Sequence, residues 1–574
     1  MRFLAQQLWR SKDILYCLLL FIVALVFSLD LFLHQGRPAT FDGPTHLTTM
    51  AQFFLGMKDG QFPVSWADGF ANYGMPIPLI AQQLTSYLGG AFIFFTRDVV
   101  LAYNLVVLLG AVLSTCFFYA FLRLFFKQES SLAGSILFSL APYRIINIYT
   151  RGAIPEFFVA VFIPLIAIGM VTFFRDKKNW GLPVFLIGLC GLILSHPMML
   201  VPASFILAPV ALVASWSCWK NWRQVLVIGF LTGAAFALTA YYLVPLFGEI
   251  KYLYYGQGTN HFISNNFLTW KNYFQPAWPY YTATDIGPRG QYFHLGTVEM
   301  VALLAGAVVT VIRFIRKPHR NLTVLDGALI VTGVIIFFTL SVSEPLYRAL
   351  LPLNNIQHPW RMLTALIFLP PFILAYLLDQ MKALQKYQYW LAGAAVLLIC
   401  GLRFPQLYGK NYIWYPDSFY YFTPINLHGE VLNTIWTGSS RDYSIQSQKA
   451  QIIGGNGQIA QMNVLTGQRQ YQVSATTPIR MVDYTFYFPG WKAYVDGQEV
   501  PIEFQDMNYR GVITYQVPEG NHQVMLRFED TKMRLLGKVV TVSTVISLVM
   551  IYFCLRLRNS AKSFSRPSKK KTAK

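Results

Sequence analysis

The chain has 574 residues, of which 55% are hydrophobic, 16% are aromatic and only 13% are charged. Soluble proteins carry about 25% charged residues, so this composition excludes an ordinary soluble protein and predicts that lipid covers much of the surface. The net charge of +20 does not indicate a nucleic-acid partner, because the basic residues lie between apolar runs, as in the cytoplasmic loops of membrane proteins.

Twelve apolar runs are predicted to cross the membrane. The first, residues 14–33, follows a basic N-terminus and precedes no small-residue cleavage site, so we expect a retained span. The others, in chain order, are residues 99–122, 132–148, 154–174, 182–194, 198–217, 225–247, 297–312, 324–342, 362–378, 390–401 and 539–555. The six cysteines lie in or beside these runs, and their spacing supports neither a disulfide framework nor a metal site.

Residues 76–96 form a further apolar stretch that could cross the membrane or lie along it. Basic clusters occur near residues 2–12, 123–127, 175–178, 220–223, 313–320, 382–386 and 556–574. All of them fall on the cytoplasmic side only if residues 76–96 remain outside as a juxtamembrane helix. We therefore predict a multi-pass plasma-membrane protein with both termini in the cytoplasm.

Four large segments then lie outside, and the longest is predicted to form a separate domain. Residues 470–475, 482–488 and 522–528 alternate in polarity, and Asp496-Gly497 and Pro518-Glu519-Gly520-Asn521 are turn signals, so we expect a β-sandwich. The predicted fold is thus mainly α-helical, with about twelve spans and an extracytoplasmic β-sandwich. Its expected parts are a membrane domain (1–406, with the first outer loop and juxtamembrane helices at 34–98), the β-domain (407–530), a last span (531–557) and a basic cytoplasmic tail (558–574).

The first outer loop contains Asp42 followed four residues later by His46. Residues at this spacing share one face of a helix, so the pair could act as a general base with its orienting partner, or as half of a metal site. The alternative is structural: Asp42 caps the helix that begins near Pro44.

Three arginines, Arg144, Arg151 and Arg361, lie at predicted outer ends of spans, where the positive-inside bias makes cations less expected. A guanidinium can hold a phosphate with two hydrogen bonds, which makes these residues candidate phosphate ligands. Snorkelling or a salt bridge, such as Arg151 with Glu156, is the structural alternative. His196 and His358, both followed by proline, are candidates for binding a sugar or phosphate, or are simply helix-end hydrogen-bonding groups.

Two aromatic regions are weaker candidates. The loop at 248–296 is rich in Tyr, Trp and Asn, a composition that suits sugar rings and also, slightly better, an interfacial aromatic belt. Trp491 is expected in the core of the sandwich rather than in a carbohydrate subsite.

Several motifs together carry a family resemblance. They are Asp42-x-x-x-His46, Gly60-Gln61-Phe62-Pro63 with Trp66, Asn72-Tyr73-Gly74-Met75-Pro76, Ala141-Pro142-Tyr143-Arg144, Arg151-Gly152-Ala153-Ile154-Pro155-Glu156 and Ser195-His196-Pro197. The chain resembles the bacterial membrane family called 6-pyruvoyl-tetrahydropterin-synthase-related, which is similar to YfhO-like proteins and to the wider GT-C glycosyltransferases. Later segments, Gln357-His358-Pro359-Trp360-Arg361 and 488–497, also look like YfhO-type sequence.

The resemblance implies a GT-C-like glycosyltransferase whose site lies on the outer face. Its expected donor is a polyprenyl-phosphate-linked sugar, made by a separate enzyme, and its acceptor is a cell-envelope polymer such as lipoteichoic acid, a glycolipid or a protein. By the same resemblance Asp42 is the catalytic base. Combined with the arguments from the residues themselves, the predicted site has His46 beside Asp42 and Arg151, Arg361 and Arg144 on the donor phosphate. The residues predicted to bind substrate are Glu156, His196, His358 and Tyr73. The family often pairs two acidic residues here; this chain has only Asp42, so a divalent metal is left open and no other cofactor is expected.

Two other functions are compatible with a multi-span chain. A transporter or flippase for lipid-linked saccharides would place functional charges near the middle of the membrane, whereas the candidates here lie at outer ends. A non-catalytic scaffold displaying the sandwich is the third. ATP-driven transport has no support, because the chain contains no phosphate-binding loop motif.

Overall fold

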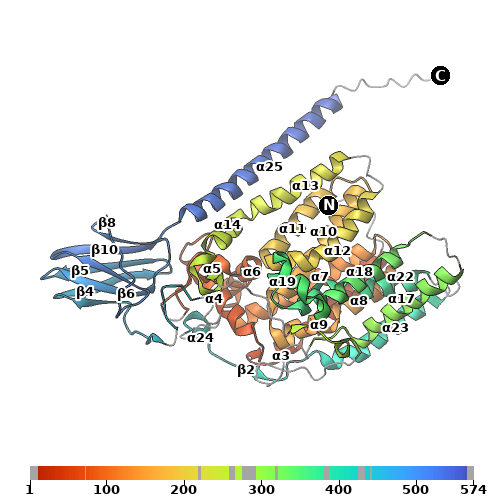
Figure 1. Cartoon of the computed structure of the whole chain (residues 1–574), viewed down its shortest axis with the longest axis horizontal. Helices are drawn as coiled ribbons and strands as arrows, with labels where there is room; N and C mark the ends of the chain where they lie inside the picture. Colours follow the sequence, from red (N-terminus) through yellow and green to blue (C-terminus); the bar gives the residue numbers. More distant parts are fainter. Residues whose placement is uncertain are drawn as a thin grey trace.

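In the computed structural model a large helical part carries a β-sandwich at one end, and a long last helix leaves the junction between them (Figure 1). The structure describes residues 11–70, 73–216, 222–257, 266–274, 293–316, 321–380, 387–423, 433–439 and 442–564. Outside these ranges lie both ends of the chain, with most of the basic tail, Asn72 of the first loop, and much of the aromatic loop at 248–296.

The predicted apolar runs are helical over most of the residues that the structure describes, with breaks such as the one at Leu140 and Ala141. Among the described residues, eight helices are long and apolar enough to span a membrane, and a pair bent by 66°, Trp222–Leu238 and Ala240–Tyr252, makes a ninth if it is one span. The eight are Val99–Leu122, Gln128–Arg151, Ile154–Phe174, Pro197–Ser215, Thr297–Arg316, Pro359–Gln380, Tyr389–Gln406 and Lys532–Leu557. The chain is therefore a multi-pass membrane protein.

Three of the twelve predicted spans are not among the helices that are long and apolar enough to cross a membrane. Helix α2 (Ser11–Ser28) is not among the candidates, and α11 (Gly181–Ser195) and α18 (Val324–Thr339) are shorter apolar helices. At 1.5 Å per residue, helices of this length fall short of a hydrocarbon core of about 30 Å. The count of twelve thus stays a prediction.

The main helices of the membrane part are packed side by side. They are α2, α7 (Val99–Leu122), α8 (Gln128–Ser139), α10 (Ile154–Phe174), α11, α12 (Leu200–Ser215), α13 (Trp222–Leu238), α14 (Ala240–Glu249), α17 (Thr297–Arg316), α18, α22 (Leu369–Gln380), α23 (Gln388–Arg403) and α25 (Lys532–Phe564). Helix α10 is the most enclosed, because all but one of its residues are buried, including Glu156 in its first turn. Helix α10 therefore runs through the interior of the helical part.

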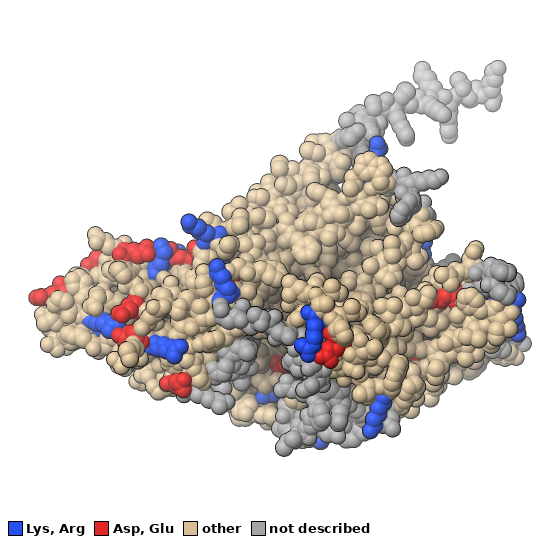
Figure 2. Space-filling model, viewed as in Figure 1, with Lys and Arg blue, Asp and Glu red and all other residues tan. Residues whose placement is uncertain are grey.

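The surface shown in Figure 2 agrees with this division. On that face, charged side chains gather on the sandwich, whereas the described surface over α13, α14 and α25 is almost entirely uncharged. Many apolar side chains of α25, such as Leu536 and Ile546, are exposed on the isolated chain. Lipid is the medium in which such a surface is stable.

The ambiguous stretch 76–96 forms two helices, α5 (Ile77–Ile80) and α6 (Gln83–Thr96). Helix α6 packs on α4 (Gly43–Lys58), the helix of the first loop, and glycines make the contact close. A Cβ on Gly89 would lie 2.3 Å from Met50 Cγ. Neither α5 nor α6 is among the candidate spans, as the parity of the basic clusters requires.

The sandwich consists of two antiparallel sheets with the order β4-β5-β10-β7-β8 and β3-β6-β9. The strands are β3 (Ala450–Gly454), β4 (Gly457–Leu465), β5 (Gln468–Ala475), β6 (Ile479–Phe486), β7 (Trp491–Val495), β8 (Gln498–Val500), β9 (Val512–Val517) and β10 (Gly520–Phe528). Both sheets contribute to one core that includes Tyr471, Met481 and Trp491, so Trp491 is a core residue as expected. The predicted Asp496-Gly497 turn joins β7 to β8, with φ of 48° and 82°.

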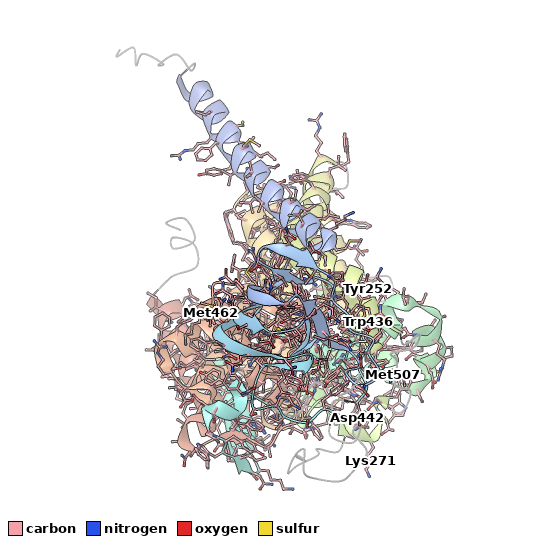
Figure 3. The ribbon with its side chains drawn as sticks, turned by 90° about the vertical axis from the view of Figure 1, so that its left-hand side faces the viewer. Tyr252, Lys271, Trp436, Asp442, Met462 and Met507 are labelled. Carbon is pink, nitrogen blue, oxygen red and sulfur yellow. The ribbon has the colours of Figure 1, made fainter. Side chains whose placement is uncertain are left out.

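The segment before the sandwich belongs structurally to the first loop. Strand β2 (Tyr412–Ile413) pairs with β1 (Arg37–Pro38), and α24 (Asp417–Tyr421) packs on α4. Tyr252 and Trp436, which Figure 3 places next to each other, stack with ring centroids 5.6 Å apart. The strands of the sandwich therefore begin at residue 450, and the domain boundary at 407 stays a prediction.

The first loop and the sandwich are firmly joined. The carboxylate of Asp59 accepts hydrogen bonds from the amide and hydroxyl of Thr466, both at 2.7 Å. Asp68 forms a buried ion pair with Arg469, whose guanidinium lies over Trp491. These contacts hold the C-terminal end of α4 on the sandwich, and α6 packs against another side of α4. The loop that carries Asp42 therefore has a defined position.

Candidate functional site

The site begins where the first loop meets the end of the predicted span at 132–148. That segment runs through α9 (Pro142–Ile146) into a π-helical turn at Asn147–Arg151. The amide of Phe41 donates to the carbonyl of Thr150 at 3.2 Å, and that of Asp42 to the carbonyl of Arg151 at 2.6 Å. Turns of this kind are frequent at functional sites, and this one delivers Arg151 to the loop.

Two glycines allow this close approach. Gly152 has φ of +70°, a conformation that favours glycine, and a Cβ there would lie 2.6 Å from the amide nitrogen of Gly43. Gly43 is similarly enclosed, because its own Cβ would lie 2.2 Å from Thr40 Oγ1. The position of Asp42 beside Arg151 therefore depends on two residues without side chains.

Asp42 occupies the N-cap position of α4 but does not act as a side-chain cap. Its carboxylate makes no capping hydrogen bond, although the backbone carbonyl accepts the amide of His46 at 3.1 Å. The side chain is 48% exposed, and its Oδ2 lies 3.8 Å from Nη2 of Arg151. The capping alternative is wrong for the carboxylate, which is accessible to a ligand.

Behind Asp42 lies a buried cluster of two arginines and one glutamate. Arg151 Nη1 donates to Glu156 at 2.9 Å, and Arg361 Nε lies 3.5 Å from the same carboxylate oxygen. Glu156, only 1% exposed, also accepts from Tyr143 and, at 2.8 Å, from Thr364. The expected salt bridge of Arg151 with Glu156 is thus present. Glu156 also pairs with Arg361, which is distant in sequence.

The two guanidinium groups keep some hydrogen-bonding capacity. Arg151 Nη1 is also held by Asn147 at 2.6 Å, and Arg361 Nη1 by Gln357 at 3.0 Å, so each group has one well-fixed nitrogen. Arg361 Nε is buried and has no hydrogen-bond partner among the described residues. Fixed cations with unused N–H groups are suited to a phosphate.

An aromatic ring lies beneath both cations. The guanidinium of Arg151 is 4.4 Å from the centroid of Trp360 and that of Arg361 is 5.7 Å from it. His358 and Phe293 stack on the same ring, with centroids 4.9 and 4.1 Å from it. The predicted residue His358 is therefore part of the site as a ring that supports Trp360.

The remaining two histidines also border the cluster. Burial lowers the pKa of His46 to about 4; Asp42 opposes this shift and Arg151 adds to it, so the imidazole is neutral at pH 7. His196 is buried next to the charged cluster, and its Nδ1 has no hydrogen-bond partner in the described part of the chain. Neither histidine adds a charge to the site.

The structure does not bring Arg144 and Tyr73 to this site. Arg144 lies between Phe138 and Phe157 and donates to Ser114 Oγ at 2.8 Å, within the helix packing. Tyr73 stacks on Phe486 of β6 and belongs to the contact between the first loop and the sandwich. Their contacts in the fold are structural.

The donor atoms near Asp42 do not fit a metal held by the protein alone. Asp42 and His46 supply two groups, the Glu156 carboxylate is occupied by arginines, and the described residues contain no group of three His, Cys, Asp or Glu able to hold a metal. Hard divalent ions prefer several oxygen ligands. We therefore derive no chemical step through a metal.

Sequence analysis gave no role to several residues of the site, among them Asn147, Thr364 and Tyr103. Asn147 and Thr364 hold Arg151 and Glu156, and Tyr103 reaches the carbonyl of Gly152 at 3.4 Å. Asn147 lies four residues before Arg151, and Thr364 lies three after Arg361, so helical spacing was the signal available for these two. Tyr103 carries no local signal.

Residues 83–407 match the protein family described as the 6-pyruvoyl-tetrahydropterin synthase related domain, a membrane protein family. The chain belongs to this family. The match covers more than half of the chain and confirms the family predicted from the motifs, although it begins after the loop that carries Asp42. A comparison with curated protein sequences found no match to this chain.

Two solved structures are similar in outline. One is ArnT from Cupriavidus metallidurans bound to undecaprenyl phosphate, with 14% identity, a TM-score of 0.38 and coverage of 71% of this chain and 68% of that one. The other is the Archaeoglobus fulgidus oligosaccharyltransferase in the apo form, with 14% identity, a TM-score of 0.39 and coverage of 76% and 62%. This chain thus spans less than two thirds of the second protein, and at these scores neither similarity carries a functional argument.

Proposed function

We propose that this chain is a membrane glycosyltransferase that takes a sugar from a polyprenyl-phosphate-linked donor and transfers it to a cell-envelope acceptor on the outer face. The observation that carries the proposal is the exposed, uncapped carboxylate of Asp42 next to the buried Arg151–Glu156–Arg361 cluster. The family resemblance of the motifs supports the same assignment. The acceptor is a glycan, a glycolipid or a protein.

Asp42 has the properties of a general base in this scheme. Its carboxylate is exposed enough to meet an acceptor hydroxyl, and its backbone is fixed by hydrogen bonds to Arg151 and His46. It removes the hydroxyl proton as that oxygen bonds to the anomeric carbon, and the bond from this carbon to the donor phosphate oxygen breaks. Attack from the face opposite the leaving phosphate inverts the anomeric configuration.

The arginines have a matching role at the leaving group. As the sugar–phosphate bond breaks, negative charge increases on the polyprenyl phosphate, where fixed cations stabilise the transition state most. Arg151 and Arg361 carry two positive charges, which balance the carboxylates of Glu156 and Asp42 before the reaction. When Asp42 takes the hydroxyl proton its charge is lost, so one positive charge is left for the departing phosphate. A phosphate leaving group needs little protonation, so one base and these cations suffice.

The orientation in the membrane is part of the proposal. The predicted twelve spans place both termini and the basic clusters in the cytoplasm and the first loop, the site and the sandwich outside. A donor activated by its lipid phosphate allows transfer there without nucleotides. A separate enzyme would then load the sugar onto the lipid.

Arginine-to-lysine substitution tests the donor site. In purified protein assayed with a synthetic short-chain polyprenyl-phosphate sugar, Arg361→Lys keeps the charge but loses the planar fork, so the KM for the donor should rise about tenfold or more. The KM for the acceptor should change little. Arg348→Lys is the matched control, because Arg348 is an exposed arginine paired with Glu344 outside the site.

Two results would contradict the proposal. Equal effects of both arginine variants would remove the phosphate site. Movement of an intact lipid-linked saccharide across the membrane, without cleavage of the sugar–phosphate bond, would replace the transferase with a transporter.

A further inference from the structure

A cavity lies apart from the proposed site and is lined in part by the start of the first loop. It has a volume of about 260 Å³ and is formed by α3 (Asp30–Leu33), the loop after it, the N-terminal turns of α7 and the segment around α24. Tyr103 of α7 faces Gly152 in the proposed site, whereas its neighbour Asn104 lines this cavity. The cavity and the proposed site therefore share helix α7 but no lining residue.

The polar lining of the cavity combines two carboxylates with the side chains of Asn104, Gln35 and His34. Asp98 and Asp417 both line it, and none of the described lining residues is Lys or Arg. Asp98 accepts from the amide of Leu101 at 2.8 Å, and Asp417 from the amide of Val99 at 3.3 Å, so both carboxylates sit at the first turn of α7. Within the described chain, neither carboxylate forms an ion pair.

A buried amide oxygen adds an independent observation. Asn104 is only 4% exposed, and its Nδ2 donates to the carbonyl of Leu31 at 2.7 Å. Its Oδ1 is buried and finds no hydrogen-bond partner among the described residues. A buried acceptor without a donor is costly, so this oxygen is suited to a ligand that brings one.

Two uncompensated carboxylates are unusual in a chain with a net charge of +20. Burial, followed by the neighbouring Asp98 carboxylate, raises the pKa of Asp417. Arg37 and Arg97 belong to adjacent segments, but neither pairs with Asp98 or Asp417 in the part of the chain described. A bound cation would relieve this repulsion.

The aromatic and apolar walls define the rest of the ligand. Trp414, 57% exposed, presents an indole, the ring that binds cations best. Tyr415 is less available, because it stacks on Phe419 and has Arg37 on its ring. Phe32 and Leu101 line the same cavity and are partly exposed at the ends of apolar helices, so one side opens toward lipid.

We propose that this cavity binds a primary ammonium group, with Asp98, Asp417 and Asn104 Oδ1 as acceptors and Trp414 as the adjoining ring. An ammonium has three N–H donors and no acceptor, which matches the three acceptor groups named here. The apolar wall favours the headgroup of an ethanolamine phospholipid from the membrane as the source of the ammonium. A free amine is the other source of the same chemistry. The proposal does not depend on sugar transfer.

Binding of defined lipids tests the proposal directly. Purified full-length protein is exchanged into mixtures of ethanolamine and choline phospholipids with identical acyl chains, and retained lipid is identified by native mass spectrometry. The ethanolamine lipid should be enriched, and Asp417→Asn, which keeps an acceptor for Val99, should reduce the enrichment about tenfold. Trp414→Ala should reduce it as well.

The control is Asp442→Asn, because Asp442 is an exposed carboxylate that accepts from the amide of Ser439 at 3.1 Å (Figure 3). It should leave the enrichment unchanged. Calorimetry with ethanolamine and with ethylene glycol separates the second source: binding of ethanolamine alone, abolished by Asp417→Asn, supports the site with a soluble ligand. Equal retention of both lipids without ethanolamine binding, or equal binding of ethylene glycol, would overturn the proposal.

Discussion

Asp42→Asn separates catalysis from stability more cleanly than any other substitution in the site. The carboxylate makes no capping hydrogen bond, and the two bonds that hold residue 42 come from its backbone. The substitution therefore removes one half-exposed ion pair with Arg151 at 3.8 Å, worth about 1 kcal/mol or less. Loss of the general base should lower the rate by roughly 10²- to 10⁴-fold, or about 3–5 kcal/mol in the barrier. The effect on catalysis is thus expected to exceed the effect on folding.

The assay follows release of polyprenyl phosphate from a synthetic short-chain donor, with thermal unfolding measured on the same preparations. Asp530→Asn is the matched control, because Asp530 is a partly exposed carboxylate paired with Lys538 at 2.6 Å, outside the site. Its activity should equal that of the unmodified protein. An Asp42→Asn protein with normal turnover would refute the assignment of the base, and one that is inactive only because it unfolds would refute the structural reasoning.

Three further predictions concern the loop and its orientation. In a background without native cysteines, Gly60→Cys should react with an impermeant thiol reagent outside intact cells and Lys177→Cys should not; the reverse pattern would exclude the proposed topology. Gly152→Ala should lower activity at least about tenfold, because the added Cβ would meet the first loop. Gly60→Ala is the control: at φ +83° and with no atom within 4 Å of the added Cβ, it should cost backbone strain alone, about 1–3 kcal/mol of stability. Equal effects of the two variants on activity would contradict the close-approach argument. The pKa of His46, about 4, lies below its ordinary value, so stability should be lost as pH falls from about 6.5 to 4, and His46→Gln should weaken this loss in thermal unfolding; an unchanged loss would show that another group titrates.

The elements of the fold were largely predictable because they depend on local patterns. Long apolar runs gave the helices, with α7 and α10 ending where the runs end. Alternation gave β5, β6 and β10, and the Asp496-Gly497 turn fixed the register of β7 and β8. The bend at Thr239 and the short lengths of α11 and α18 were not predicted, because hydropathy does not distinguish a straight helix from a broken or short one.

The site was predictable only as a set of residue types. Asp42, Arg151, Glu156 and Arg361 were recognised from motifs and their expected positions, and the structure brings them together. Arg144, only seven residues from Arg151, was grouped with it, yet its side chain lies between Phe138 and Phe157. Where an α-helix continues into a π-helical turn, the number of residues per turn changes, so side chains a few residues apart point in different directions.

The sequence by itself determined that this protein lies in a membrane, where its main helices run and that a β-rich domain follows them, because burial and backbone hydrogen bonding depend on the periodicity of apolar residues. Only the tertiary structure decided that Asp42 is exposed and uncapped, and that Glu156 joins two arginines from distant segments. It alone placed Asp98, Asn104 and Asp417 around one cavity. These groups meet through close backbone contacts such as Gly43 against Gly152, and such contacts leave no periodic pattern in the sequence.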